Sequence, residues 1–199
     1  QEIALAGPAA SAQAEISGMA WFRDNLILLP QFPKRISTAG DGALLAIPRQ
    51  RLLDYFQGKD TQPILPVEIP ILTGGIEKEM LIFEGFEAIA FQDNRVYLAI
   101  EGRSGVNMMG YLVRGEVSAD LSEIRLEAKS LTANPPQARQ QNRTDEAILV
   151  AGGKLLTFFE SNGAQANPGS YASVFDLNLQ AQGKLDIPPV EYRLTDATP

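Results

Sequence analysis

Acidic residues recur in this chain at a fixed spacing, and carboxylates can bind cations or carry protons. Glu87 and Glu146 each begin a similar segment, and each is followed fourteen residues later by a second glutamate, Glu101 and Glu160. A spacing that repeats in this way indicates an internal repeat. The sequence therefore predicts that equivalent carboxylates from successive copies take part in one site.

The same frame extends toward both ends of the chain. Ser17 begins an earlier copy, with Gln31 fourteen residues after it, and Asp196 begins a later one. Copies arranged around an axis bring their first residues together. We therefore predict a metal site formed by Ser17, Glu87, Glu146 and Asp196. Because these ligands are all oxygen atoms, the preferred ion is Ca²⁺, with Mg²⁺ less favoured.

Glu87 and Glu146 are also the predicted catalytic residues, which bind the metal or accept a proton. A structural alternative stays open, because a glutamate at a strand start can also bond to the neighbouring copy. Its partners would then be backbone groups or a basic residue such as Arg103, Arg143 or Arg193. The second set, Gln31, Glu101 and Glu160, is predicted to be structural or to face the rim.

The composition excludes several classes of chemistry. The 199 residues contain no Cys and no His, which rules out thiolate nucleophiles, Ser-His-Asp relays and imidazole-bound metals. A net charge of −7 argues against nucleic acid as a partner. No apolar run is long enough for a membrane span. Any metal must therefore be held by oxygen.

The repeated segments have the pattern of β-hairpins. Their turns are Asp93-Asn94 and Gly152-Gly153, which suit tight turns with positive φ. Pairing outward from these turns places Glu87 opposite Ile100 and Glu146 opposite Phe159. Strand alternation sends Ile89 and Phe91, with Glu87, to one face and Ala88 and Ala90 to the other, where close packing is expected.

Further extended stretches follow each hairpin, and four short strands per copy predict an all-β fold, a β-propeller of four-stranded antiparallel blades. Blades are expected to start near residues 15, 85, 144 and 194, giving three blades and the start of a fourth within a ring of about six. The partner would be the remaining blades or a second chain. A β-sandwich is the alternative. Residues 1–14 are expected to form a flexible arm before the propeller segment 15–199, and residues 48–57 a short helix.

Two loops after the hairpins occupy equivalent places in consecutive copies. They are Glu101-Gly-Arg103 and Glu160-Ser-Asn162. We predict Glu101, Arg103, Glu160 and Asn162 as rim residues that contact a substrate, with Arg103 able to hold a phosphate or carboxylate. The alternative is that these residues serve turn geometry.

Several segments resemble the phytase-like, or esterase-like, β-propeller proteins of bacteria. They are Glu15-Ile-Ser-Gly-Met-Ala-Trp21, Glu84-Gly-Phe-Glu-Ala-Ile-Ala90 with Tyr97-Leu-Ala-Ile-Glu101, and Asp145-Glu-Ala-Ile148 with Phe159-Glu-Ser-Asn-Gly163. The resemblance spans most of residues 15–199. It implies an exported protein, periplasmic or secreted after removal of a signal peptide. The related calcium-dependent phytases hydrolyse phosphomonoesters at acidic calcium clusters in the channel.

The expected function is calcium-dependent hydrolysis of a small phosphoester or ester substrate. The alternative is a non-catalytic scaffold of the cell envelope that binds protein, peptide or sugar through the rim loops. Lactone hydrolysis on a similar propeller is a third, less supported class.

Overall fold

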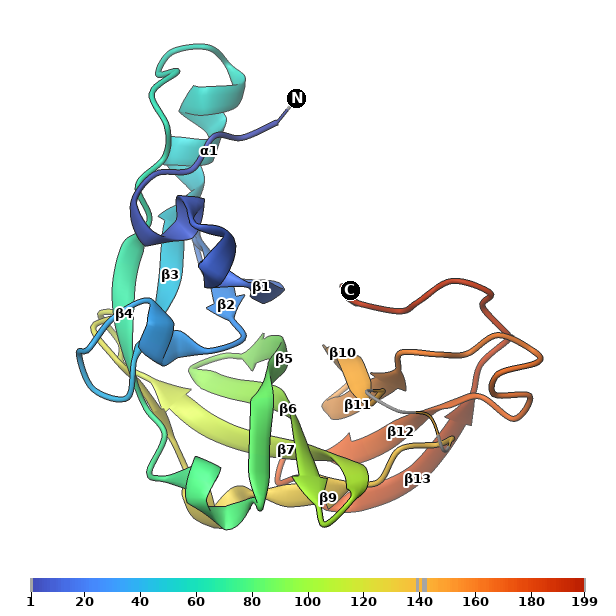
Figure 1. Cartoon of the computed structure of the whole chain (residues 1–199). Coiled ribbons are helices and arrows are strands. Elements are labelled where there is room, and N and C mark those ends of the chain that lie inside the picture. The colour runs from blue at the N-terminus through green and yellow to red at the C-terminus, as the bar shows by residue number, and fades with distance from the viewer. Residues whose placement is uncertain (1, 139, 141–142, 199) are drawn as a thin grey trace.

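The chain folds mainly into β-strands, as the computed structural model of residues 2–138, 140 and 143–198 shows (Figure 1). One α-helix, α1 (Arg49–Phe56), lies where the sequence predicts it, and the remaining helical segments are short 3₁₀ turns. None of the helices in the described residues has the length and apolar character needed to cross a membrane. The all-β prediction is confirmed.

The strands form three antiparallel units of four. Unit 1 contains β1 (Ile16–Phe22), β2 (Asn25–Pro30), β3 (Ala43–Pro48) and β4 (Val67–Leu72). Unit 2 contains β5 (Ile82–Gln92), β6 (Arg95–Ser104), β7 (Asn107–Val117) and β8 (Ile124–Leu126). Unit 3 contains β10 (Asp145–Ala151), β11 (Lys154–Phe159), β12 (Tyr171–Asp176) and β13 (Ala181–Asp186). The short β9 (Thr132–Asn134) pairs with β7.

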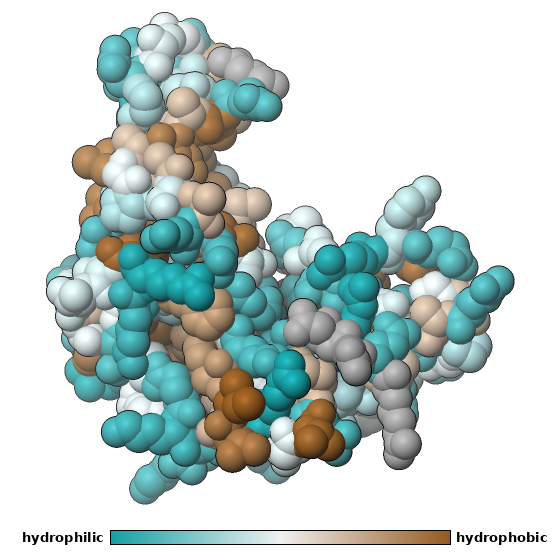
Figure 2. All heavy atoms as spheres, viewed as in Figure 1, coloured by the Kyte–Doolittle hydropathy of each residue, from teal (hydrophilic) through white to brown (hydrophobic). Residues whose placement is uncertain are grey.

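Units 1 and 2 share one continuous sheet, because β4 pairs in parallel with β8. The first strands β1, β5 and β10 lie on the inner side of the curved molecule, and we call them the inner strands (Figure 1). Figure 2 shows the hollow on this side, between the arm of the molecule that carries α1 and the C-terminal segment. Each blade of a propeller is a separate sheet. Here one sheet joins units 1 and 2, so the propeller of four-stranded blades stays a prediction.

The hydrophobic core places unit 2 between its two neighbours. One apolar cluster joins Phe22, Ile27 and Leu44 of unit 1 to Ile89 and Leu98 of unit 2. A second cluster lies on the opposite face of unit 2 and joins its alanines to unit 3, with Ala88, Ala90, Tyr97, Ala99, Ile148, Leu155 and Phe175 as members. The predicted separation of Ile89 and Phe91 from Ala88 and Ala90 is therefore confirmed.

The N-terminal segment packs on the face of unit 1 that is opposite to the face in contact with unit 2. Ile3 and Leu5 pack with α1 on a third cluster that contains Leu28, Leu45 and Ile47. The backbone N–H of Ala6 donates to the Ile64 carbonyl at 2.8 Å, and the Ile64 N–H donates to the Ala4 carbonyl at 2.8 Å. Residues 4–6 are thus held by main-chain hydrogen bonds as well as by packing.

Gly85 lies where β5 passes close to Gln31 of unit 1, so a substitution there tests whether this close approach is needed for stability. Its φ is +137°, a conformation that favours glycine, and a Cβ placed there would lie 2.3 Å from Cγ of Gln31. We expect Gly85→Ala to lower the free energy of unfolding by about 2–5 kcal/mol through backbone strain and overpacking. Urea unfolding measures this loss.

The matched control is Gly169→Ala. Gly169 has no positive φ, and a Cβ there would meet nothing within 4 Å. We expect this variant to stay within about 0.5 kcal/mol of the parent. Equal unfolding free energies for the two variants would contradict the role assigned to Gly85.

Candidate active site at the bulges of the inner strands

The three repeat positions occupy the same irregularity in each unit. Ile16 pairs with Pro30 and Gly18 with Leu29, so Ser17 lies between them in a β-bulge. Glu87 lies in the same way between Phe86, opposite Ile100, and Ala88, opposite Ala99. Glu146 lies between Asp145, opposite Phe159, and Ala147, opposite Phe158. The predicted pairing of Glu87 with Ile100 and of Glu146 with Phe159 is wrong by one residue, because the bulge inserts an extra residue here.

A bulge bends its strand and changes the direction of the side chain that it carries. As a result Phe86, and not Glu87, joins Ile89 in the cluster between units 1 and 2. The bulge therefore frees Glu87 from the apolar face to which simple alternation assigned it. The same device recurs at Ser17 and Glu146, so the repeat extends to local backbone geometry.

Glu87 is the most strongly perturbed acid of the site. Its exposed fraction is only 8%, and one carboxylate oxygen accepts a hydrogen bond from Nε2 of Gln31 at 2.8 Å. Burial raises its pKa to about 8, with further contributions from the negative charges of Glu101 and Glu146. The Gln31 hydrogen bond and the charge of Arg193 act in the opposite direction. Glu87 is therefore largely protonated at neutral pH.

Glu101 and Glu146 complete the acidic cluster. Glu101 is buried and accepts a hydrogen bond from Oγ1 of Thr144 at 3.2 Å. Burial raises its pKa, and Glu84 and Glu146 raise it further. Burial likewise raises the pKa of Glu146, whose two oxygens lie 2.9 and 3.2 Å from one nitrogen of Arg193, a contact that lowers the pKa. Three carboxyl groups from units 2 and 3 thus influence one another, with Arg193 as a nearby cation.

Ser17 and Asp196, the other two predicted metal ligands, lie in different surroundings. The hydroxyl of Ser17 is 2.6 Å from the Phe86 carbonyl of unit 2 and 3.2 Å from the Leu29 carbonyl of its own unit. Ser17 therefore bridges units 1 and 2. Asp196 is exposed on the C-terminal segment and accepts the backbone N–H of Ala197 at 2.8 Å. No hydrogen bond or ion pair between described residues joins Asp196 to Glu87 or Glu146.

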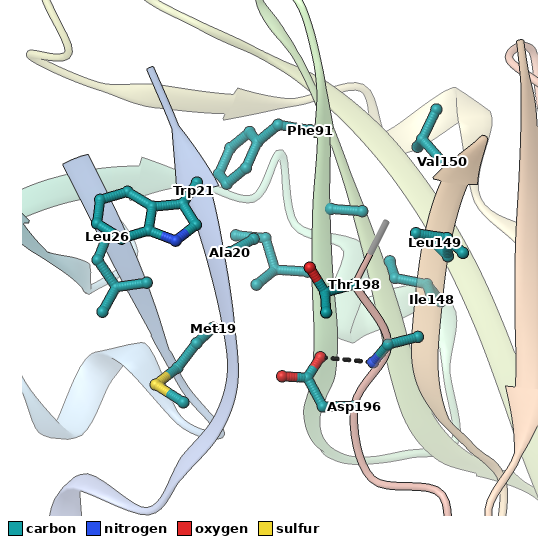
Figure 3. A pocket seen from close by; sticks show the side chains of 13 residues that line it. Met19, Ala20, Trp21, Leu26, Phe91, Ile148, Leu149, Val150, Asp196 and Thr198 are labelled. Atoms are coloured by element: carbon teal, nitrogen blue, oxygen red, sulfur yellow. Dashed lines mark hydrogen bonds between the residues drawn. The ribbon is translucent and has the colours of Figure 1, made fainter. Parts of the chain in front are cut away.

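Asp196 instead borders an apolar cleft of about 430 Å³ on the inner side. Figure 3 shows Asp196 and Thr198 between Trp21 and Met19 of β1 and the Ile148–Val150 segment of β10. The lining residues that come from β1, β5 and β10 lie toward the turn ends of these strands, whereas Glu87 lies at the bulge in the middle of β5 and Glu146 near the start of β10. The inner side therefore has an acidic part and an apolar part.

Most of the predicted rim residues are buried, and each of them forms an ion pair or a hydrogen bond with another part of the chain. Arg103 donates from Nε to Oε1 of Glu84 at 2.6 Å. Glu160 is fully buried and forms ion pairs with Arg143 and Arg193. Asn162 is fully buried and donates to the Phe159 carbonyl. Of these residues, Arg103 keeps the most exposed side chain.

The second set of repeat residues has a shared task that the sequence indicated only as structural. Gln31 contacts Glu87 through its side chain and accepts the Phe86 N–H at 3.0 Å through its carbonyl. Glu101 accepts the hydrogen bond from Thr144, just before β10. Glu160 pairs with Arg193 and accepts the Leu194 N–H at 3.0 Å. Each residue at the end of a hairpin thus holds the segment where the next copy begins.

Thr144 and Glu84 also belong to this network, although the sequence did not predict them as site residues. Neither recurs at an equivalent place in the other copies, so the repeat gave no signal for them. Glu84 lies three residues before Glu87, inside one of the segments that carry the family resemblance. This position was the only sequence feature that could have marked Glu84 as part of the site.

Within the described residues, no group of three or more acidic side chains is arranged to hold a metal ion. Glu87, Glu101 and Glu146 act on one another through their charge, and each also has a protein partner. Calcium therefore stays a prediction.

Comparisons with protein-family models, with curated proteins and with solved structures gave no match.

The raised pKa of Glu87 predicts how stability depends on pH. The folded state holds this proton up to about pH 8, whereas the unfolded chain releases it near the ordinary value of 4.5. Stability therefore falls as pH rises between these values, by up to about 1.4 kcal/mol per pH unit. We expect Glu87→Gln, which mimics the neutral acid, to flatten this slope between pH 6.5 and 8. Urea unfolding at several pH values measures it.

Glu68→Gln is the control, because Glu68 is exposed on β4. It should keep the slope of the parent protein. A slope that is identical in the parent and in Glu87→Gln would show that Glu87 ionises normally in the folded state.

Proposed function

We propose that the chain is a portion of a β-propeller whose axial carboxylates hydrolyse a small phosphoester or ester. The propeller part is supported by three successive units that share the same strand order and the same bulge, and in which the residue at the hairpin end contacts the following copy. The core supports it as well, since unit 2 packs face to face with a neighbour on each side. The blades of a propeller are related in this way.

The hydrolase part depends on one observation, the buried carboxyl group of Glu87 with its pKa raised to about 8 beside two further carboxyl groups. Acids of this kind cluster at functional sites, because an ideal proton carrier titrates near the working pH. In the proposed reaction water attacks the phosphorus or carbonyl carbon and gives a proton to Glu146. Glu87 gives its own proton to the departing oxygen.

Glu146 suits the role of base because Arg193 favours its charged form. The two glutamates occupy equivalent bulges, yet Glu87 has an amide partner and Glu146 a guanidinium partner. The pKa of both acids is raised by burial, but only Glu146 has a cation in direct contact, and unequal surroundings of this kind are a common basis for an acid and base pair.

Calcium remains part of this proposal as the ion predicted for the axial carboxylates. Burial raises the pKa values of Glu87, Glu101 and Glu146, and neighbouring carboxylates raise those of Glu87 and Glu101 further, so a bound cation would favour the charged forms. When bound, it would supply charge stabilisation. The proposed reaction has no step on the ion, because each of these acids already has a protein partner.

The proposed setting is the periplasm or the outside of a bacterial cell. It depends on the resemblance to exported phytase-like and esterase-like propeller proteins.

A non-catalytic binding scaffold is the second candidate, favoured by the links between units. Ser17, Gln31 and Glu101 all bond to the neighbouring unit. Recurrence of these positions follows from that task alone, without any catalysis. In this case the protein, peptide or sugar partner would bind elsewhere on the scaffold.

Glu87→Gln separates the two candidates. For an enzyme, we expect this variant to lose about 10²–10⁴-fold in kcat on a phosphomonoester or aryl ester while its Tm stays close to that of the parent. Glu68→Gln should keep full activity. Turnover that is absent in the parent protein, or equal in parent and Glu87→Gln, would favour the scaffold.

Calcium binding is tested by calorimetry on metal-stripped protein at pH 7. If Glu87 is a ligand, its proton must leave on binding. The apparent binding enthalpy will then depend on the ionisation enthalpy of the buffer, and the slope of that dependence will correspond to the release of up to about one proton. Binding should also raise the Tm of the protein. Saturable binding with no proton release would exclude Glu87 as a ligand, and no binding would exclude the calcium site.

A further inference from the structure

A small pocket lies where units 1 and 2 meet, and none of its lining residues belongs to the acidic cluster of Glu87, Glu101 and Glu146. Its volume is about 240 Å³, just below the range of about 300–1,000 Å³ that is typical of ligand sites, so it suits a small molecule. One side comes from the connection between β2 and β3, which includes the 3₁₀ turn Pro33–Arg35. The other side comes from β5 and from the preceding 3₁₀ turn Ile76–Glu79.

Three phenylalanine rings form the apolar wall of this pocket. The ring centroid of Phe83 lies 5.2 Å from that of Phe86 and 6.2 Å from that of Phe32. Phe86 is buried in the core that units 1 and 2 share, whereas Phe32 and Phe83 are half-buried. The Arg35 guanidinium carbon lies 4.0 Å from the centre of the Phe32 ring. One ring of the wall therefore already binds a cation on one of its faces, as the negative face of an aromatic ring favours.

Two acidic side chains, Asp41 and Glu77, also line the pocket. Both contact the buried Thr73, whose Oγ1 is 3.0 Å from Oδ2 of Asp41 and 3.1 Å from Oε2 of Glu77. The backbone N–H of Thr73 donates to the same Asp41 oxygen at 2.9 Å, and this bond lowers the pKa of Asp41 against the opposing effect of burial. Asp41 is therefore ionised at neutral pH.

The contacts of Thr73 leave Glu77 with unused acceptor capacity. A hydroxyl group has one proton, so it donates to Asp41 or to Glu77 but not to both at once. Among the described residues, the other partner of Glu77 is Lys34, whose Nζ lies 3.5 Å from Oε1 and whose side chain is 64% exposed. An exposed ion pair of this kind contributes little to stability. A donor inside the pocket can therefore take the place of Lys34.

The lining residues combine an aromatic wall with two negative charges and one positive charge. Lys78 also acts on Asp41 through its charge but does not line the pocket. A small organic ammonium ion matches this combination, because its apolar part packs on the rings and its N–H groups donate to Glu77. An anion would face two carboxylates, and a neutral apolar molecule would give them no new partner.

We propose that this pocket binds a small organic ammonium ion with an aromatic or aliphatic substituent. The proposal goes beyond hydrolysis and does not depend on it, since the pocket shares no residue with the proposed acid and base. Because the walls come from unit 1, from unit 2 and from the connection between them, the bound ion should stabilise the contact between these units.

The probe is 2-phenylethylammonium, and the neutral 2-phenylethanol, which has a similar shape, is its control. We expect calorimetry at pH 7 to show saturable binding of the ammonium ion to the unaltered protein. Its dissociation constant should be at least about tenfold lower than that of the alcohol, because only the ion interacts with the rings and carboxylates through charge. Added salt should weaken the binding of the ion. Equal affinity for the two molecules would overturn the proposal.

Two substitutions should change the affinity for 2-phenylethylammonium in opposite directions. Glu77→Gln should weaken binding at least about tenfold, because it removes a charge and keeps the shape of the side chain. Lys34→Ala should strengthen binding, because it removes the cation that competes for Glu77. Glu79→Gln is the matched control, since Glu79 is exposed on the same 3₁₀ turn and does not line the pocket. This control should bind the ion as the parent does.

No saturable binding to the unaltered protein, up to the solubility limit of the amine, would overturn the proposal. Binding that appears only in Lys34→Ala would overturn it as well, because Lys34 would then be the occupant of the site. The same holds for equal weakening in Glu77→Gln and Glu79→Gln. Because none of these results depends on turnover or calcium binding, failure here and failure of the hydrolase proposal are distinguishable.

Discussion

Close packing of unit 2 against both of its neighbours is the constraint on which the rest of the structure depends. Gly18 lets β1 approach the backbone of β5, since a Cβ on Gly18 would lie 3.3 Å from Cα of Ala88. Ala88 and Ala90 in turn leave room for Ile148 and Leu155 of unit 3. Larger side chains on these inner positions would move the units apart. The small residues therefore decide how near the bulges of the inner strands come to one another.

This closeness produces the electrostatics of the site. Carboxyl groups from adjacent units are brought within range of one another and are shielded from water, and both effects oppose ionisation. Burial raises the pKa of Glu87, Glu101 and Glu146, and repulsion adds to the effect at Glu87 and Glu101, while Gln31, Thr144 and Arg193 supply compensating contacts. The chemistry of Glu87 is thus a property of the packing between units as much as of its own side chain.

Much of the fold could be predicted from sequence because its signals are local. The turn residues have the expected geometry, with φ of 54° at Asp93 and 56° at Gly152. Strand alternation assigned Ile89 and Ala88 to the correct opposite faces, and α1 forms where the sequence predicts it. Each of these features depends on neighbours within a few residues.

The candidate site was less predictable because its contacts cross between units. The bulge at Glu87 has no local marker, so the pairing was displaced by one residue from that point. The recurrence did identify Glu87, Glu101 and Glu146 as related. Their separate partners, and the position of Asp196 beside an apolar cleft, depend on how the units and the C-terminal segment are arranged in space.

The parallel pairing of β4 with β8 has a consequence for cooperativity. Main-chain hydrogen bonds join units 1 and 2 at their outer strands, whereas the strands of unit 3 form a separate sheet. Unit 3 is held by side-chain packing and polar contacts, including the hydrogen bond from Asn134 to Asp145. Transient opening of this unit therefore breaks no strand ladder with the other two. Unit 3 can therefore open as a local unit of stability while the sheet shared by units 1 and 2 stays paired.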